Sequence, residues 1–547
     1  MNRSRFAGFY SVFTLTLALF VFTYVFTGCF YETNDDVILT FLISGVFNQQ
    51  PLPNLTLYLH GFSQGMAFLY QILPNVPWYG LILYSLLFSI TGLAFWLIYQ
   101  HLRPRYSPGK IYLLLIFLYL ANWYEHVFWF NYSRLPILFA GMAGLVALVD
   151  RQLGKPFTFR QALIPGFLLL VAFCIRPSLA VFGFLLVMPL LLYSPGLTFS
   201  FRKSARQVLP FVFGCIVVSM VMLVQDTPAQ KQYRRYDVLK SQILDYYWCC
   251  SPPVNPADKL LYAGIEQWFL ADQNSTKFLT QHAADSHFFW QQVALAKLMQ
   301  FLKYLVFDQF LAVSFIAGLL WYSRFSWRKK DLYWLGLYHV YFWSILVVTG
   351  LFFKIPPRIF TPAISLLLLV HLLALPVAIN QVKRPVYARV LGLCLLLAQL
   401  YKINHRVGWQ QQRQHQSEVV WRQVQNNYPG YFIIAAGLEN ELRALRPFKT
   451  YALPQQKLLA ITSWQTLDPQ YAQFWYNRTK QTNLGEALLQ LSRQEKVIWI
   501  SNPDFMFFLQ RFFKFFYGRD LQFSQVKLIS SPTSPEKLGY YKVKIKN

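Results

Sequence analysis

The chain has 547 residues, of which 55% are hydrophobic and only 13% are charged. Soluble globular proteins carry about 25% charged residues, so this composition nearly excludes a water-soluble enzyme. The formal net charge of +27 fits a membrane protein, because basic residues gather at the cytoplasmic ends of membrane helices. No compact basic domain or basic-aromatic motif indicates nucleic-acid binding.

Long apolar runs recur along the sequence, and about 20 mostly apolar residues are enough to span a bilayer as a helix. They predict an all-α polytopic membrane protein with eleven transmembrane helices, followed by a small C-terminal α/β domain. The first run follows Arg3 and Arg5 and is expected to be an uncleaved helix. The predicted spans are residues 8–30, 79–100, 111–124, 134–150, 161–175, 178–194, 208–224, 305–322, 332–353, 359–379 and 386–402.

The short connections between these spans differ in basic content. With the N-terminus in the cytoplasm, the inner loops hold 18 Lys and Arg residues and the short outer connections hold 4. This bias predicts that orientation. We therefore expect a transmembrane module over residues 1–402, with external loops at about 31–78 and 225–304, and an external soluble domain over residues 403–547.

The C-terminal segment has the pattern of a small α/β unit. Residues 431–436 and 497–501 read as buried strands, and residues 526–530 with 540–545 read as a closing hairpin. Residues 484–493 and 505–516 read as helices. The segment contains no Gly-rich phosphate loop and no metal-ligand cluster, so the sequence assigns it no chemistry.

Acidic residues are scarce in the first 225 positions, and three of the five cluster after the first span as Glu32, Asp35 and Asp36. Carboxylates at a helix end are often only solvated interfacial charges. Here the stretches Val37–Phe47 and Leu52–Leu73 that follow are largely apolar, and they predict helices lying on the membrane surface or packed on the spans. Adjacent carboxylates against apolar surface are costly unless a partner or a task keeps them there. Asp35 and Asp36 are therefore candidate catalytic residues.

Four basic residues lie on the short outer connections, where the charge rule disfavours them: Arg134, Arg176, Lys354 and Arg358. Singly, each has an alternative interpretation as a side chain that extends to the lipid headgroups. Together they favour a reaction on a lipid-borne phosphate, because arginine binds phosphate through a planar fork.

Further polar residues of the outer segments are weaker candidates for substrate contacts. His60 follows an apolar stretch of the first outer loop, where a histidine is more often a structural residue. Glu32 precedes the acidic pair. Arg234, Arg235, Asp245 and Asp272 belong to the second long outer segment, in which polar residues are ordinary.

The order of these features resembles the GT-C glycosyltransferases, which use polyprenyl-phosphate sugars as donors. Members have about eleven to thirteen spans, and an acidic pair follows the first helix in a large external loop with surface-lying helices. A second long external loop follows span seven, and many members end in an external soluble domain. Here the pair is Asp35-Asp36, and the turn from Lys354 to Arg358 is similar to the family's basic turn near the lipid phosphate. The Trp-Trp-Asp-type signature of oligosaccharyltransferases is missing, which argues against transfer of a whole oligosaccharide.

The resemblance implies transfer of a sugar from a polyprenyl-phosphate donor to an acceptor hydroxyl at the outer face, with inversion of the anomeric centre. Asp35 would be the general base, with Asp36 as the orienting residue or alternative base. The cations Arg176, Lys354, Arg358 and Arg134 would hold the donor phosphate. The scheme requires no cofactor, and a divalent metal is not indicated.

The partners implied are the lipid-linked donor, membrane lipids and a glycan, lipid or protein acceptor, with no nucleic acid. The resemblance also implies a bacterial inner (plasma) membrane, with the C-terminal domain periplasmic or extracellular.

Two other functions remain open at this point. A transporter or a flippase for lipid-linked glycans would share the spans and the external loops. Such proteins often show repeated halves and polar residues near the bilayer midplane. This sequence shows no clear repeat, and its midspan histidines, His339 and His371, are expected to be unpaired. The third possibility is a catalytically inactive relative that only scaffolds envelope assembly.

Overall fold

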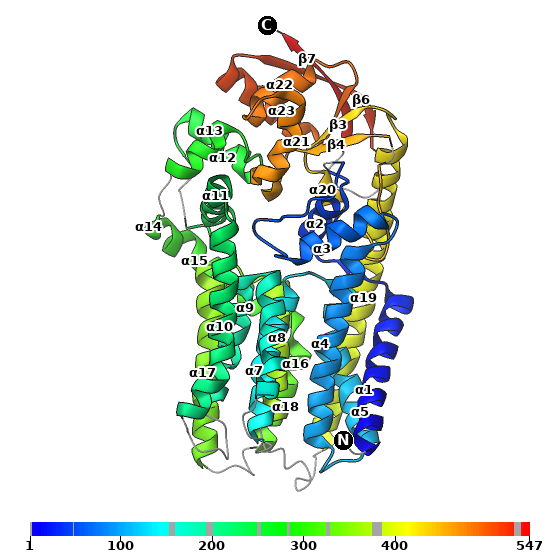
Figure 1. The fold of residues 1–547 in the computed structure, drawn as a ribbon, viewed down its shortest axis with the longest axis vertical. Coiled ribbons are helices and arrows are strands. Elements are labelled where there is room, and N and C mark those ends of the chain that lie inside the picture. Colours follow the sequence, from blue (N-terminus) through cyan, green and yellow to red (C-terminus); the bar gives the residue numbers. More distant parts are fainter. Residues whose placement is uncertain are drawn as a thin grey trace. The chain divides into compact units, whose positions relative to one another are not determined.

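The computed structural model describes residues 3–47, 49–152, 159–192, 201–248, 253–281, 285–323, 329–374, 386–453, 455–529 and 538–546. The chain divides into two compact units, each assembled from three separate stretches of sequence (Figure 1). We call residues 1–30, 81–224 and 297–409 the helical unit, and residues 31–80, 225–296 and 410–547 the mixed unit.

Helices dominate the helical unit. They are α1 (Arg3–Phe22), α4 (Trp78–Leu102), α5 (Pro108–Leu118), α6 (Tyr124–Phe128), α7 (Arg134–Gln152), α8 (Phe159–Ile175), α9 (Pro177–Leu192), α10 (Phe201–Gln225), α15 (Ala294–Lys303), α16 (Phe310–Ser323), α17 (Lys329–Phe352), α18 (Pro357–Ala374) and α19 (Val386–Asn426). Three π-helical turns, Thr23–Thr27, Tyr119–Trp123 and Tyr304–Asp308, extend or join them, and two-residue strands occur at β1 (Phe30–Tyr31) and β2 (Trp129–Phe130).

Several of these helices are suited to a membrane. Among the described residues, four are long and apolar enough to span a bilayer: Phe6–Thr27, Trp78–Leu102, Pro108–Phe128 and Leu332–Phe352. A fifth span results if the bent pair Ser286–Asp308 and Phe310–Trp321 is counted as one. A helix lies at every predicted span, but the structure supports four or five spans and not the full eleven. The ends of the predicted spans 178–194 and 359–379 lie outside the described residues.

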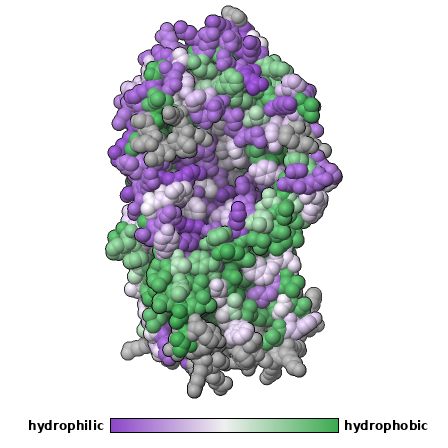
Figure 2. Space-filling model, turned by 180° about the vertical axis from the view of Figure 1, so that it is seen from behind, coloured by the Kyte–Doolittle hydropathy of each residue, from purple (hydrophilic) through white to green (hydrophobic). Residues whose placement is uncertain are grey.

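Apolar side chains also cover the outside of the helical unit. Large exposed ones include Leu17 on α1, Phe213 on α10 and Val340 on α17. Figure 2 shows such hydrophobic residues gathered over the surface of these helices. Exposed apolar surface of this extent is stable in contact with lipid rather than water. The protein is therefore a helical membrane protein.

The interior of the helical unit is organised around α7, which packs on α8, α9 and α18. Small residues permit the closest of these contacts. At Gly183 of α9, an added Cβ would overlap the backbone carbonyl of Ile137 in α7. At Gly141 of α7, an added Cβ would overlap the side chain of Leu366 in α18. Close approach of backbones through small residues is the usual way in which membrane helices pack.

The mixed unit combines helices with one sheet. Its helices are α2 (Asn34–Ser44), α3 (Phe62–Ile72), α11 (Pro228–Leu244), α12 (Pro256–Glu266), α13 (Gln273–Gln281), α14 (Ser286–Phe288), α20 (Leu438–Glu441), α21 (Pro469–Thr479), α22 (Leu484–Ser492) and α23 (Pro503–Tyr517), with a π-helical turn at Phe289–Val293 and a 3-10 helix at Trp464–Leu467. The strands are β3 (Phe432–Ala435), β4 (Lys457–Ala460), β5 (Val497–Ser501), β6 (Asp520–Leu528) and β7 (Gly539–Lys546).

The five-stranded sheet has the order β4-β3-β5-β7-β6. Strands β3, β4 and β5 are parallel, whereas β7 runs antiparallel to both β5 and β6. The first strand of the set, β3, lies between β4 and β5. The chain passes from β3 to β4 on one side and then to β5 on the other side, so the direction of the strand order reverses at β3. In open α/β sheets, ligands bind beside the carboxyl ends of the strands at such a switch point.

The sequence predicted part of this unit. The strands at β3 and β5, the helices at α22 and α23 and the C-terminal hairpin are confirmed, although β6 begins at Asp520, six residues before the prediction. Strand β4 was missed. The predicted helix from Leu52 is wrong as far as Gly61, because Pro51 and Pro53 disfavour a helix there and Gly61 has a φ of +80°.

The helix α19 is much longer than the span predicted at its start. It continues without a break for 41 residues, from Val386 to Asn426. Residues up to Trp409 belong to the helical unit, and those from Gln410 belong to the mixed unit. A boundary between a membrane module and a soluble domain at residue 402 therefore falls inside one continuous helix.

Because α9 packs so closely on α7, we expect Gly183→Ala to destabilise the helical unit by about 1–3 kcal/mol. The new methyl group would meet a backbone carbonyl, which cannot rotate away as a side chain can. Thermal denaturation of the detergent-solubilised protein measures the loss. The control is Gly336→Ala on α17, where an added Cβ meets nothing within 4 Å. Equal melting temperatures for the two variants would contradict the α7–α9 packing.

Candidate functional site

The two candidate catalytic carboxylates lie in the first turn of α2, where the helix dipole favours negative charge. Their environments differ. Asp36 is fully buried, and its Oδ1 accepts a hydrogen bond of 2.9 Å from the Tyr79 hydroxyl. Asp35 is half-buried, and its Oδ1 accepts a hydrogen bond of 3.1 Å from the indole N–H of Trp464. Of the two, Asp35 is the carboxylate that a substrate can reach.

The residues that hold the start of α2 follow two parallel strands of the sheet. Trp464 begins the 3-10 helix after β4, and its indole forms a T-shaped contact with the Tyr58 ring, with ring centroids 5.2 Å apart. The Asn34 side chain donates a hydrogen bond of 3.0 Å to Asn440, which lies in α20 after β3. Asp35 thus lies beside the carboxyl ends of β3 and β4.

A buried cation accompanies Asp35. The ammonium group of Lys240, on α11, is 2.6 Å from Asp237, and its side chain is only 5% exposed. Burial by itself lowers the pKa of Lys240, but the negative charges of Asp237, Asp245 and Asp35 outweigh that effect and raise the pKa above its ordinary value. Lys240 is therefore a permanent positive charge among three carboxylates.

The weaker candidates of the outer segments do not all lie at one place. His60, Arg234 and Asp245 lie around α11, and Arg234 pairs with Asp226 at 2.8 Å. Glu32 is buried just before α2. Asp272 is elsewhere in the mixed unit, where it accepts a hydrogen bond from the Tyr517 hydroxyl, and Arg235 is exposed on α11.

The four predicted phosphate-binding cations belong to the helical unit. Arg134 is fully buried at the start of α7 and donates to His126 Nδ1 at 3.3 Å. Arg176, between α8 and α9, donates to the Tyr132 hydroxyl at 3.1 Å. Lys354 is exposed, and Arg358 is half-buried in the first turn of α18. The sequence-predicted residues are thus divided, with the acidic candidates, His60, Arg234 and Arg235 in the mixed unit and the four predicted phosphate-binding cations in the helical unit.

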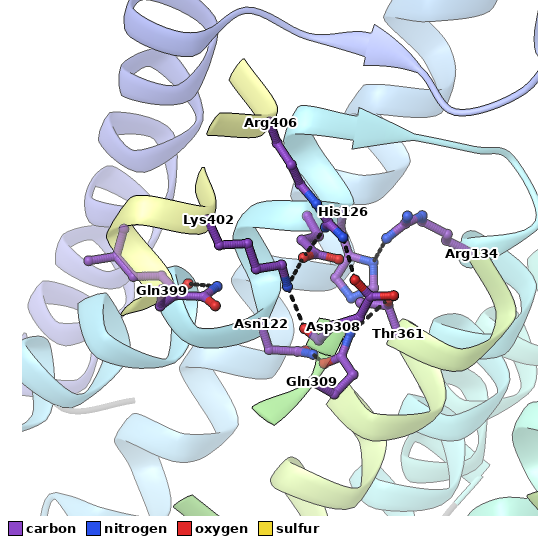
Figure 3. A network of polar contacts seen from close by, with 11 residues as sticks. Asn122, His126, Arg134, Asp308, Gln309, Thr361, Gln399, Lys402 and Arg406 are labelled. Carbon is purple, nitrogen blue, oxygen red and sulfur yellow. Dashed lines mark hydrogen bonds and ion pairs between the residues drawn. The ribbon is translucent and has the colours of Figure 1, made fainter. Parts of the chain in front are cut away.

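A charge network that the sequence analysis missed lies in the helical unit (Figure 3). Glu125 Oε1 accepts from Lys402 at 2.8 Å and from Arg406 at 2.6 Å. Arg406 also pairs with Asp308. The second oxygen of Glu125 is buried without a hydrogen-bond partner among the described residues. The network combines two carboxylates and two cations from α6, α19 and the π-helical turn before α16.

Neutral side chains extend this network toward Arg134. His126, which accepts from Arg134, is 2.8 Å from the Ser365 hydroxyl, and Ser365 in turn contacts Asn122. The Asn122 amide donates to Gln309 at 2.7 Å, and Gln309 donates to Thr361 at 3.0 Å. The result is a polar region between packed helices that are otherwise apolar.

Two sequence signals pointed toward this network. Glu125 is the one acidic residue between Asp36 and Asp150. Lys402 and Arg406 are four positions apart at the end of the last predicted span, so they share one face of a helix. Neither signal indicates the pairing, because Arg406 is 281 positions from Glu125.

The midspan histidines were also predicted wrongly. His339 on α17 and His371 on α18 were expected to be unpaired, but their Nε2 atoms lie 3.0 Å apart. Within the described residues, no group of three or more His, Cys, Asp or Glu side chains is arranged to hold a metal ion.

Comparison with known proteins gives no match, either among protein-family models or among curated sequences.

The environment of His60 predicts its titration. Burial is the main cause that lowers its pKa to about 4, and the positive charge of Arg234 adds to it. Because the folded-state value lies below the ordinary 6.5, the contribution of His60 to stability is complete above pH 6.5 and is lost as the pH falls through 4. NMR of ¹³C-labelled histidine in the full chain, assigned with His60→Gln, should show a midpoint near 4. A midpoint near 6.5 would contradict the buried environment.

Loss of one charge from the network should be costly. Glu125→Gln leaves Lys402 and Arg406 without their shared carboxylate, and we expect a loss of about 3–5 kcal/mol in stability, as for other broken buried pairs. The matched control is Glu418→Gln in the mixed unit, which breaks the pair with the more exposed Lys449. That variant should lose less, because it removes one ion pair instead of two and Lys449 is 46% exposed and stays solvated when its partner is removed. Thermal denaturation in detergent compares the two, and a smaller loss for Glu125→Gln would refute the network's stabilising role.

Proposed function

We propose that the protein is a membrane glycosyltransferase that moves a sugar from a polyprenyl-phosphate donor to an acceptor hydroxyl. The observation that carries the proposal is the geometry of Asp35. Its carboxylate is half-buried in a helical membrane protein, is fixed by the Trp464 N–H and lies among charged groups. A positioned carboxylate of this kind suits a general base.

In the proposed reaction, the acceptor oxygen forms a bond to the anomeric carbon of the donor sugar while its proton passes to Asp35. The bond between that carbon and the phosphate oxygen breaks, and polyprenyl phosphate leaves with the electron pair. Attack opposite the leaving group inverts the anomeric centre. Asp36 is buried against Tyr79 and has the role of fixing the start of α2.

The donor phosphate is assigned to cations of the helical unit. Lys354 and Arg358 flank the start of α18, where the helix N-terminus adds to their attraction for an anion. Arg176 is half-buried and donates to Tyr132, so it is held in a fixed position. Arg134 is the least suited of the four, because its side chain is fully buried. In this proposal the eleven predicted spans all cross the inner membrane of a bacterium, and the two long loops and the C-terminal domain are periplasmic or extracellular.

A second candidate function is transport of a lipid-linked glycan. The observation that favours it is the pairing of His339 with His371 inside the helical unit, together with the charged network around Glu125. Paired polar groups among membrane helices often mark a translocation pathway. Such a protein would move the lipid without breaking the sugar–phosphate bond.

We expect purified protein in nanodiscs to release polyprenyl phosphate from at least one member of a panel of radiolabelled polyprenyl-phosphate sugars, with water or an added oligosaccharide supplying the acceptor hydroxyl. Asp35→Asn should lower the rate by about 10²-fold or more, because the general base is lost. Arg358→Ala should slow release by weakening the hold on the phosphate.

The control for Asp35→Asn is Asp504→Asn, which removes an exposed carboxylate from the first turn of α23 and should retain the full rate. If every donor stays intact, glycosyl transfer is refuted. Movement of an intact lipid-linked sugar across proteoliposomes would then favour the transporter.

A further inference from the structure

Three aromatic side chains are connected to the proposed base, Asp35, directly or through a neighbouring residue, and two of them serve as support. Trp464 donates to Asp35, and the Tyr58 ring forms a T-shaped contact with Trp464. Both are more than nine-tenths buried, so they offer little surface to a ligand. They fix the position of the carboxylate.

The third aromatic residue, Trp268, is only half-buried. Two separate routes connect it to the surroundings of Asp35. The ammonium group of Lys240 lies 5.2 Å from the centroid of the indole ring, within the range of a cation–π contact. The Trp268 carbonyl accepts a hydrogen bond of 3.0 Å from the N–H of Ser463, the residue that precedes Trp464.

The backbone at both ends of that hydrogen bond is strained. Trp268 has a φ of +61° and Ser463 a φ of +80°, in the left-handed region that L-residues rarely adopt. Each such residue costs about 1 kcal/mol or more, and the surrounding structure has to maintain it. Here the strained residues accompany the indole of Trp268, which lies beside Lys240, and the indole of Trp464, which lies beside Asp35.

The groups around Trp268 match the chemistry of a sugar ring. A sugar has an apolar C–H face that packs on an aromatic ring, and its hydroxyl groups bond to carboxylates and ammonium groups. Asp35, Asp237 and Asp245 are half-buried and supply acceptors for hydroxyl groups, and the buried Lys240 supplies the positive charge beside them. A lipid tail would gain nothing from these four charges, since it has no polar groups to bond to them.

We propose that Trp268 is the stacking platform for the acceptor and that the acceptor is a carbohydrate. The proposal rests on the proposed glycosyltransferase function and names the substrate class of the same site. It also gives a binding role to the second long outer segment.

The test is binding of soluble oligosaccharides to the full-length protein in detergent, measured by saturation-transfer NMR. The probes are maltotriose, cellotriose, mannotriose and chitotriose at millimolar concentration. We expect at least one of them to bind, and Trp268→Ala to weaken that binding by about tenfold. Trp268→Phe keeps an aromatic face and should restore most of it. Trp290→Ala removes an exposed tryptophan from the π-helical turn at Phe289–Val293 and should change nothing.

Equal binding by the wild type and Trp268→Ala would overturn the proposal, as would the failure of all four probes to bind. A thermal denaturation curve for each variant separates loss of the platform from loss of the fold. Donor cleavage by the wild type is measured independently. Sugar binding that depends on Trp268, without cleavage of any donor, would support the sugar site and refute the transferase. Donor cleavage without sugar binding would support the transferase and refute the sugar site at Trp268.

Discussion

A charge inside apolar surroundings needs a partner, and this requirement explains contacts between residues that are far apart in the sequence. Glu125 ends a run of apolar helix, and an isolated carboxylate there would cost several kcal/mol. Lys402 and Arg406 remove that cost by approaching within 2.8 Å and 2.6 Å. To do so, α19 has to return to α6 after more than 250 residues of intervening chain. The ion pairs therefore set the position and rotation of α19 within the helical unit more specifically than apolar packing could.

The same requirement acts in the mixed unit with different groups. Asp36 accepts a hydrogen bond from the Tyr79 hydroxyl, whereas Asp35 accepts one from an indole N–H and also interacts with the charge of Lys240. The arrangement around Asp35 leaves this residue only half-buried. Adjacent residues in a helix point about 100° apart, so one can be structural while the other stays reactive. Two adjacent acidic residues thus occupy different environments, one fully buried and the other half-buried.

What the sequence predicted depends on how local the cause is. Apolar runs correctly predict a helix at each predicted span. Short apolar runs and turn residues correctly predict β3, β5 and the C-terminal hairpin. Helices and strands of this kind are predictable because they depend on residues close together in the sequence. The four-residue strand β4 has too short a pattern to detect. The contact between Trp464 and Asp35 joins positions 429 apart, and the pairing of His339 with His371 depends on how α17 and α18 pack. No periodicity encodes such contacts, so the contact of the C-terminal segment with the candidate site was missed.

The order in which the ribosome makes the chain gives the three-part mixed unit a further property. Of the three stretches of the mixed unit, the one with α2 is made first, and the one with the sheet is made last. Val37, Ile38 and Leu39 of α2 are fully buried in the finished protein. At about 5–20 residues per second, roughly 20–90 s pass between the synthesis of Asp35 and that of Trp464. During that interval α2 lacks the sheet that completes its unit. The hydrogen bond that fixes Asp35 therefore forms only after residue 464 has been made, and a chain released before that point carries Asp35 without the indole that holds it.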